Sequence, residues 1–113
     1  MNEFDFDSVD IKVPKRGENS HKGDFGRLLI VGGSEGMGGA AILSSEAALY
    51  CGAGLINLKT HNTNIQASLE RNPEVMCSGI DSDLSMKKID TLLFGPGLKN
   101  DKWAYNAFQN CLK

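Results

Sequence analysis

The chain alternates short apolar runs with amphipathic segments, a pattern typical of a protein that mixes strands and helices. Residues 28–31, LLIV, form a continuous apolar run that predicts a strand buried on both faces. After a glycine cluster, residues 40–51 repeat apolar side chains at helical spacing, and residues 55–59 predict a second strand. Together these segments have the length of a strand–helix–strand unit, whose two strands lie parallel and whose crossover is right-handed.

The alternation continues to the end of the sequence. The further predicted elements are a helix at 64–70 ended by Pro73, a strand at 74–77, a helical turn at 84–88, a strand at 91–94 and a final helix in which Trp103, Ala107, Phe108, Cys111 and Leu112 share one face. Residues 1–26 show little periodicity, so we expect an irregular lead-in with a short helix near its start. The pattern predicts an α/β fold with a mainly parallel sheet. An apolar final helix after so few strands predicts that this sheet is incomplete.

Composition narrows the class of protein. The chain has 113 residues, 41% of them hydrophobic and 23% charged, as in one small globular domain. A net charge of −2 argues against a nucleic-acid partner. No apolar run approaches the roughly 18 residues of a membrane span, and the acidic start is not a secretory signal, so we expect a cytoplasmic protein without a membrane partner. The 3 cysteines form no C-x-x-C pair, which predicts buried free thiols and no metal site.

Two glycine clusters, at 32–39 and 95–97, each follow a predicted strand and so lie on the same edge of the sheet. Gly36, Gly38 and Ala41 make a G-x-G-x-x-A pattern, but it begins well after the strand and no acidic residue follows the second strand to hold a ribose. No Lys-Ser or Lys-Thr completes a Walker A loop. Glycines before a helix still favour an anion or a nucleotide at this edge. Tight turns and close helix packing are the alternative.

Three separated motifs carry a more specific resemblance. Residues 21–60, HKGDFGRLLIVGGSEGMGGAAILSSEAALYCGAGLINLKT, combine a KG-x-x-G lead-in, a glycine loop and GAGL. NPEVM at 72–76 and FGPGL at 94–98 follow in the same order. This set resembles the opening of the NAD(P)H-hydrate dehydratases, members of the ribokinase-like superfamily. The resemblance implies a ribokinase-like three-layer fold, with residues 1–20 as a lead-in segment and 21–113 as the N-terminal portion of the dehydratase domain.

The resemblance also implies an activity. Dehydratases of this family use ADP or ATP with Mg²⁺ to repair NADHX and NADPHX, phosphorylating the ring hydroxyl and eliminating phosphate to restore NAD(P)H. It implies that Gly39 and Ala40 at the helix start, and Gly95 and Gly97 in the GPGL loop, contact this substrate. Lys99 replaces the last glycine of the family's GPGLG, which either alters the loop or adds a cation near the substrate.

The catalytic residues are not identified, because the family's aspartate base is expected beyond residue 113. The isolated chain is therefore expected to be inactive. Two roles stay open for Lys22 and Arg27, a phosphate contact and an ordinary surface position, and likewise a nucleotide contact or a surface position for His21. Glu46 is expected to be a polar partner within the fold. The alternatives are a ribokinase-like kinase of a sugar or vitamin and a non-catalytic nucleotide-binding fragment. A homo-oligomer also stays open, since Trp103 and Phe108 suit an interface as well as a core.

Overall fold

The computed structural model of the chain describes residues 5–8, 26–81 and 88–112. Its elements follow in the order η1 (Phe6–Ser8), β1 (Arg27–Val31), α1 (Gly38–Tyr50), β2 (Leu55–Lys59), η3 (Asn62–Asn64), α2 (Ile65–Arg71), β3 (Met76–Ser78), β4 (Thr91–Phe94) and α3 (Lys102–Cys111). The predicted strand at 55–59 and strand at 91–94 are confirmed with these bounds. Apart from Lys88, the predicted turn at 84–88 lies outside the described residues, as does most of the lead-in.

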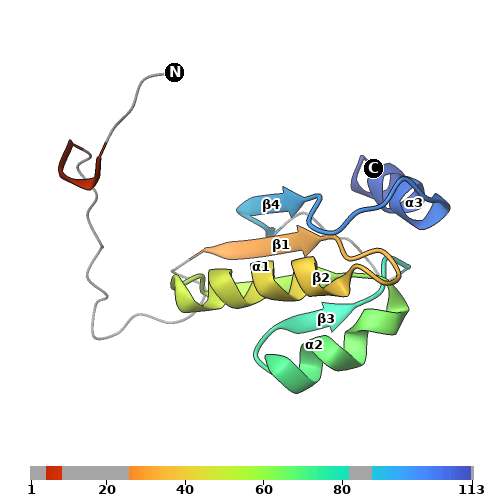
Figure 1. Cartoon of the computed structure of the whole chain (residues 1–113), viewed down its shortest axis with the longest axis horizontal. Helices are drawn as coiled ribbons and strands as arrows, with labels where there is room; N and C mark the ends of the chain where they lie inside the picture. The colour runs from red at the N-terminus through yellow and green to blue at the C-terminus, as the bar shows by residue number, and fades with distance from the viewer. Residues whose placement is uncertain (1–4, 9–25, 82–87, 113) are drawn as a thin grey trace.

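The strands form one parallel sheet in the order β3-β2-β1-β4, which confirms the predicted α/β class (Figure 1). β1 is central, and its register places Leu29 beside Asn57 of β2 and Leu92 of β4. After β3 the chain returns past β1 to place β4 on the opposite side. The reversal of strand order therefore falls between β1 and β4, the point where open α/β sheets bind ligands.

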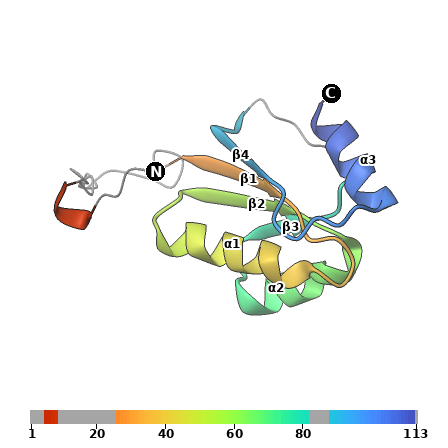
Figure 2. The same cartoon turned by 45° about the horizontal axis from the view of Figure 1, so that its top comes forward.

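Helices cover the two faces of the sheet unequally. Figure 2 shows α1 and α2 on one face and α3 alone on the other. Alternate residues of β1 serve the two faces: Ile30 packs with Ala41 of α1, whereas Val31 packs with Ala107 of α3. Burying a side chain such as Ile30 contributes about 1.5–3 kcal/mol to folding. The continuous run LLIV is thus explained by burial on both faces.

α1 approaches the sheet closely because its inward side chains are small. The buried positions are Gly38, Ala41 and Ser45, and the Ser45 hydroxyl donates to the Ala41 carbonyl at 2.8 Å. Leu43 is 58% exposed, so the apolar spacing at 40–51 did not single out the inward face. The helix ends as predicted at a glycine: Gly52 has φ +95°, and the N–H that follows it bonds back into the last turn.

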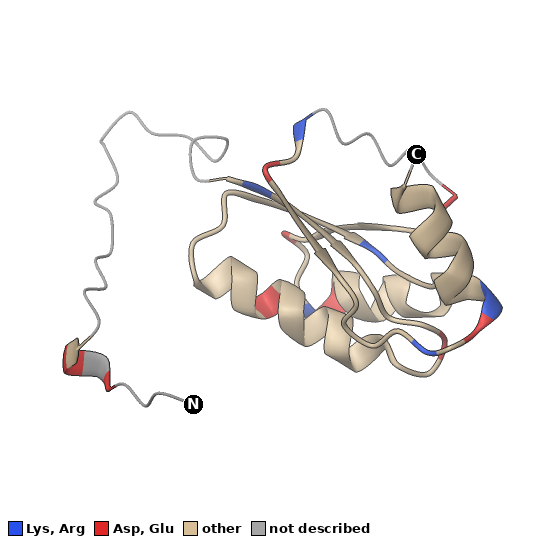
Figure 3. Ribbon diagram, turned by 90° about the horizontal axis from the view of Figure 1, so that it is seen from above, with Lys and Arg blue, Asp and Glu red and all other residues tan. Residues whose placement is uncertain are grey.

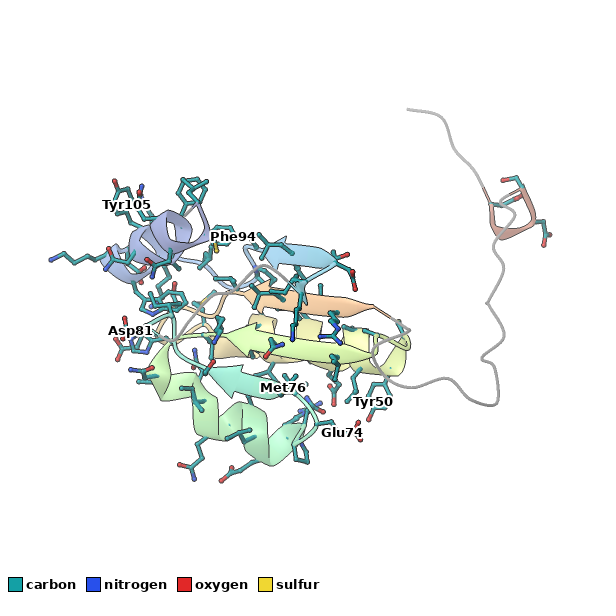
Figure 4. All side chains as sticks on the ribbon, turned by 180° about the vertical axis from the view of Figure 1, so that it is seen from behind. Tyr50, Glu74, Met76, Asp81, Phe94 and Tyr105 are labelled. Atoms are coloured by element: carbon teal, nitrogen blue, oxygen red, sulfur yellow. The ribbon has the colours of Figure 1, made fainter. Side chains whose placement is uncertain are left out.

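Two predicted elements differ from the structure, β3 in where it begins and α3 in which residues it buries. β3 begins later than the predicted strand at 74–77, because Pro73 and Glu74 lie in a turn closed by the Val75 N–H and the Asn72 carbonyl at 3.0 Å. In α3 the buried residues are Ala104 and Ala107. The other predicted members of that face are half-buried or exposed, with Phe108 at 45% and Leu112 at 66% exposure. Figure 4 shows Phe94 between β4 and α3, and Tyr105 on the outer side of that helix.

The cysteines are free thiols that differ in exposure, and an ion pair joins two helices. Cys77 and Cys111 are half-buried free thiols, and burial raises the pKa of each. Cys51 is also free but exposed, so the prediction of buried thiols is wrong for that residue. Glu46 accepts two hydrogen bonds from Arg71, which joins α1 to α2 and confirms its role as a polar partner. This pairing raises the pKa of Arg71.

No helix among the described residues is both long and apolar enough to cross a membrane. The predicted cytoplasmic location stays a prediction. The division into a lead-in at 1–20 and a domain at 21–113 also stays a prediction, because most of residues 1–25 fall outside the described ranges.

Candidate functional site

Two glycine loops meet at the carboxyl edge of the sheet. Figure 2 shows the β1–α1 connection and the β4–α3 connection side by side at one end of the molecule. Three hydrogen bonds join them: Gly33 N–H to the Pro96 carbonyl at 2.8 Å, Ser34 N–H to the Gly97 carbonyl at 3.0 Å, and Lys99 N–H to the Ser34 hydroxyl at 3.0 Å. Ser34 is fully buried. The two loops therefore form one bonded unit.

The close contact of the loops requires glycine at particular places. Gly97 has φ +70°, and a Cβ there would overlap the Met37 carbonyl and press on the Ala40 methyl group. A Cβ at Gly32 would overlap the Pro96 carbonyl. These glycines are needed by the protein itself, which explains part of the glycine pattern without any ligand.

The β2–η3 connection holds the glycine loop from the other side. The Gly33 carbonyl accepts three donors: His61 N–H at 3.1 Å, the Thr60 hydroxyl at 3.0 Å and the Asn64 amide at 2.8 Å. With φ +77°, Gly33 can turn this carbonyl toward them. A carbonyl with three donors is firmly fixed, so the loop before α1 is preorganised.

Sequence reasoning missed Ser34, Thr60 and Asn64 as the residues that position this site. A usable signal was present, because a polar run, THNTN, directly follows the strand at 55–59. Polar side chains at the carboxyl end of a parallel strand commonly serve the neighbouring loops. The pairing of Asn64 with Gly33, 31 residues apart, could be found only from the fold.

The first turn of α1 presents its backbone to the outside. Met37, at the N-cap, provides no side-chain hydrogen bond, and no acidic residue lies in the first turn. Gly39 is exposed, and a Cβ there would meet nothing within 4 Å. The neighbouring Ala40 is exposed as well. Such a helix start carries partial positive charge and N–H donors suited to an anion.

The structure brings together three of the four residues that the resemblance assigned to substrate. Gly39, Ala40 and Gly97 lie at the junction of α1 with the GPGL loop, where a Cβ on Gly97 would be 3.2 Å from the Ala40 methyl carbon. Gly95 lies earlier in its loop, where its N–H donates to the Val31 carbonyl at 3.0 Å and a Cβ would have open space. Gly38 packs against Asn64, so its place in the G-x-G-x-x-A pattern has a structural cause.

Charged groups around the site are few. The Lys99 ammonium lies over the glycine loop, 3.4 Å from where a Cβ of Gly36 would be. Asp101 accepts the Ala104 N–H at 2.8 Å and so caps α3. Arg27 begins β1 and lies at the opposite end of the sheet, while His21 and Lys22 fall outside the described residues. Figure 3 shows the acidic and basic residues spread over the described segments of the ribbon.

A divalent cation finds no built site in this part of the fold. Within residues 5–8, 26–81 and 88–112, no group of three or more His, Cys, Asp or Glu side chains could hold a metal ion. The first N–H groups of a helix such as α1 are donors of the kind that bind phosphate groups in other proteins.

The parallel α/β sheet with glycine loops at its strand reversal is the fold of the ribokinase-like class, since a ribokinase-like superfamily protein from Enterococcus faecalis gives a TM-score of 0.77 at 34% identity, covering 84% of this chain and 35% of that protein. A family model described as NAD(P)H-hydrate dehydratase matches residues 28–113, and the chain therefore belongs to this family. It is 44% identical over 101 residues to the ADP-dependent (S)-NAD(P)H-hydrate dehydratase of Staphylococcus aureus, a match that covers 86% of this chain. The resemblance noted from the three motifs is confirmed.

Solved structures agree with the sequence match. A hypothetical protein from Streptococcus mutans superposes with a TM-score of 0.78 at 38% identity, covering 85% of this chain. The ADP/ATP-dependent NAD(P)H-hydrate dehydratase of Bacillus subtilis, co-crystallised with ATP/Mg²⁺, gives 0.74 at 28% identity and covers 88%. The chain spans only 36% and 38% of these two proteins, and 37% of the Staphylococcus aureus relative.

Proposed function

We propose that this chain forms the substrate-side part of an ADP- or ATP-dependent dehydratase that converts NADHX and NADPHX back to NADH and NADPH. The observation that carries the proposal is the junction of the α1 start with the GPGL loop, where Gly39 and Ala40 are exposed and Gly97 lies against them within a hydrogen-bonded loop pair. Family membership supplies the reaction, and the junction supplies a place for the dinucleotide.

In this proposal the residues divide into two kinds. Gly39, Ala40 and Gly97 contact the hydrated nicotinamide nucleotide, and Gly95 borders the same loop. Thr60 and Asn64 position the glycine loop through the Gly33 carbonyl. The proton transfers, ADP or ATP and its Mg²⁺ are assigned to the rest of the dehydratase domain, because the chain spans only 37% of the Staphylococcus aureus relative. The isolated chain should therefore bind substrate without turnover.

A chimera tests the proposal. The chain replaces the matching segment of the Staphylococcus aureus relative, to which it is 44% identical, and the purified chimera is given NADPHX with ADP or ATP. We expect recovery of reduced-nicotinamide absorbance that depends on the nucleotide. A folded chimera that restores no absorbance but phosphorylates an added sugar or vitamin alcohol would support the kinase alternative instead.

A further inference from the structure

His61 lies just after β2, where its backbone joins two segments that hold the glycine loop. Its N–H donates to the Gly33 carbonyl at 3.1 Å, and its own carbonyl accepts the Asn64 N–H at 2.9 Å. Asn64 in turn donates its side-chain amide to the same Gly33 carbonyl at 2.8 Å. The main chain of His61 therefore belongs to the network that fixes the loop before α1.

The imidazole of His61 caps η3. Its Nδ1 accepts the Thr63 N–H at 3.2 Å and lies 2.8 Å from the Thr63 hydroxyl. A backbone N–H can only donate, so Nδ1 is the unprotonated nitrogen and the proton of the neutral ring lies on Nε2. Because η3 ends at Asn64, this cap also holds the residue whose amide bonds to Gly33.

The same ring also contacts α3. The rings of His61 and Trp103 pack edge-on, with centroids 5.8 Å apart and planes 62° apart. Trp103 lies in the first turn of α3, shortly after the GPGL loop, and packs against the core that contains Val31. One side chain thus joins the β2–η3 connection to the helix that follows the second glycine loop.

Histidine at this N-cap combines two properties that the common capping residues do not combine. Asn, Asp, Ser and Thr are the usual N-cap residues, and each of them offers an oxygen that could accept the Thr63 N–H. None of them has an aromatic ring to pack on Trp103. An imidazole provides both an acceptor and a ring, so it can hold both segments at once.

We propose that His61 is a positioning residue for the junction of α1 with the GPGL loop, acting through the η3 cap on one side and through Trp103 on the other. Its imidazole fixes the glycine loop and the start of α3 relative to each other. His61 itself does not contact the dinucleotide. The inference rests on the proposed function only for the identity of the ligand at the junction.

The tautomer of His61 is the first test, because it needs no substitution. In the isotopically labelled 113-residue chain, the nitrogen chemical shifts of the neutral imidazole show which nitrogen carries the proton. We expect Nδ1 to have the shift of an unprotonated acceptor and Nε2 that of a protonated nitrogen. A proton on Nδ1 would contradict the cap and overturn the proposal.

Two substitutions separate the cap from the ring contact. His61→Phe keeps a ring beside Trp103 but removes the acceptor, so the Trp103 indole signal should stay near its wild-type position. Amide hydrogen exchange at Thr63 and Gly33 should become about fivefold faster in this variant, because the cap no longer holds η3. His61→Asn keeps the acceptor but removes the ring. Its indole signal should shift, whereas exchange at Thr63 should stay within about twofold of the wild-type rate.

Binding of NADPH to the full chain tests the consequence for the junction. Each substitution should raise the dissociation constant severalfold, and His61→Ala, which loses both contacts, should raise it most. Arg71→Gln is the control for a general loss of stability, because it removes the two bonds to Glu46 between α1 and α2. Circular dichroism checks that all variants keep the wild-type fold.

The outcomes separate this inference from the proposed function. Wild-type exchange at Gly33 and Thr63 in His61→Ala, or the same acceleration in Arg71→Gln, would overturn the positioning role. Unchanged NADPH affinity in His61→Ala despite faster exchange would also overturn it, because His61 would then serve the fold alone. If the wild-type chain does not bind NADPH while the exchange and indole changes appear as expected, the role of His61 at the junction stands and the proposed function is contradicted.

Discussion

At the junction of α1 with the GPGL loop, some glycines are required by the fold and others leave space in which a ligand could bind. Gly97 is required by the protein, because its φ is positive and any Cβ overlaps the Met37 carbonyl. Gly39 is different, since a Cβ there meets nothing within 4 Å. The same glycine-rich sequence thus contains both structural and open positions, and only the fold distinguishes them.

Gly39→Ala should improve folding and weaken binding. Alanine favours a helix over glycine by up to about 1 kcal/mol, and the added methyl group finds open space in the protein. If the dinucleotide lies against this backbone, the same methyl group displaces it. We therefore expect an unchanged or higher urea midpoint together with a severalfold larger dissociation constant for NADPH. Unchanged affinity would remove Gly39 from the site, and Gly97→Ala serves as the contrasting variant that loses stability.

Lys99→Gln should weaken binding of a phosphorylated ligand. The Lys99 ammonium lies over the glycine loop, where it adds positive charge beside the α1 start. Replacing it should raise the dissociation constant for NADPH and reduce the salt dependence of binding, because an exposed charge interaction is screened by salt. Lys102→Gln, on the exposed first turn of α3, is the control. Identical salt dependence in the wild-type chain and the Lys99 variant would show that this side chain does not contact the ligand.

At the scale of elements, the strands were largely predictable and the positioning contacts were not. The run LLIV indicated β1 because a strand buried on both faces must be apolar throughout. The inward face of α1 was not evident, because alanines and serines at 40–51 give little contrast between faces and Ser45 is buried through a bond to its own helix. The link from Asn64 to Gly33 joins segments that only the sheet brings together.

Asn64→Asp should loosen the loop before α1. The change removes the amide donor to the Gly33 carbonyl at 2.8 Å and places an acceptor against it. The carbonyl keeps its bonds from Thr60 and His61, so the expected cost is that of one lost hydrogen bond, about 0.5–1.5 kcal/mol, together with the repulsion between the two oxygens. Urea unfolding should show a destabilisation of this order, with only a small effect from Asn106→Asp on the exposed side of α3. Equal stability of both variants would argue against the Gly33 carbonyl as the fixed point of the loop.

The thiol of Cys77 should make stability depend on pH in the alkaline range. Burial raises the pKa of this β3 residue above its ordinary value of about 8.5. The folded state then holds the thiol proton more tightly than the unfolded state. The stabilisation that this proton gives is fully present below the unfolded-state pKa and is lost as pH rises through the folded-state pKa. The free energy of unfolding should fall above about pH 9, and the fall should be shallower in Cys77→Ala. The same slope in both proteins would contradict this account.

At the scale of the whole molecule, the edge strand β4 has the apolar sequence, TLLF, that is typical of a strand inside a parallel sheet. The sequence indicated an incomplete sheet from the apolar final helix, and the relatives confirm that the chain matches about a third of their length. The sequence did not indicate which edge was open. That information came from the exposure of Leu92 and Leu93 on β4.

The isolated chain should be only weakly stable. Leu92 and Leu93 on β4 are 38% and 39% exposed, so each forgoes roughly 0.6–1.2 kcal/mol of burial free energy, which matters against the roughly 5–15 kcal/mol typical of a domain. We expect a low urea midpoint and a tendency to self-associate, measured by denaturation and by light scattering. A monomer that unfolds cooperatively at high temperature would contradict this expectation.

Titration of the isotopically labelled 113-residue chain with NADPHX, followed by amide NMR, shows whether the dinucleotide binds at the junction of α1 with the GPGL loop. We expect saturable shifts centred on the amides of Gly39, Ala40 and Gly97, smaller shifts at the residues bonded to the Gly33 carbonyl, and no turnover of the ligand. The Gly39→Ala variant should need more ligand for the same shifts. Absence of shifts at the α1 start, or shifts confined to another part of the chain, would contradict the assignment of this junction as the dinucleotide site.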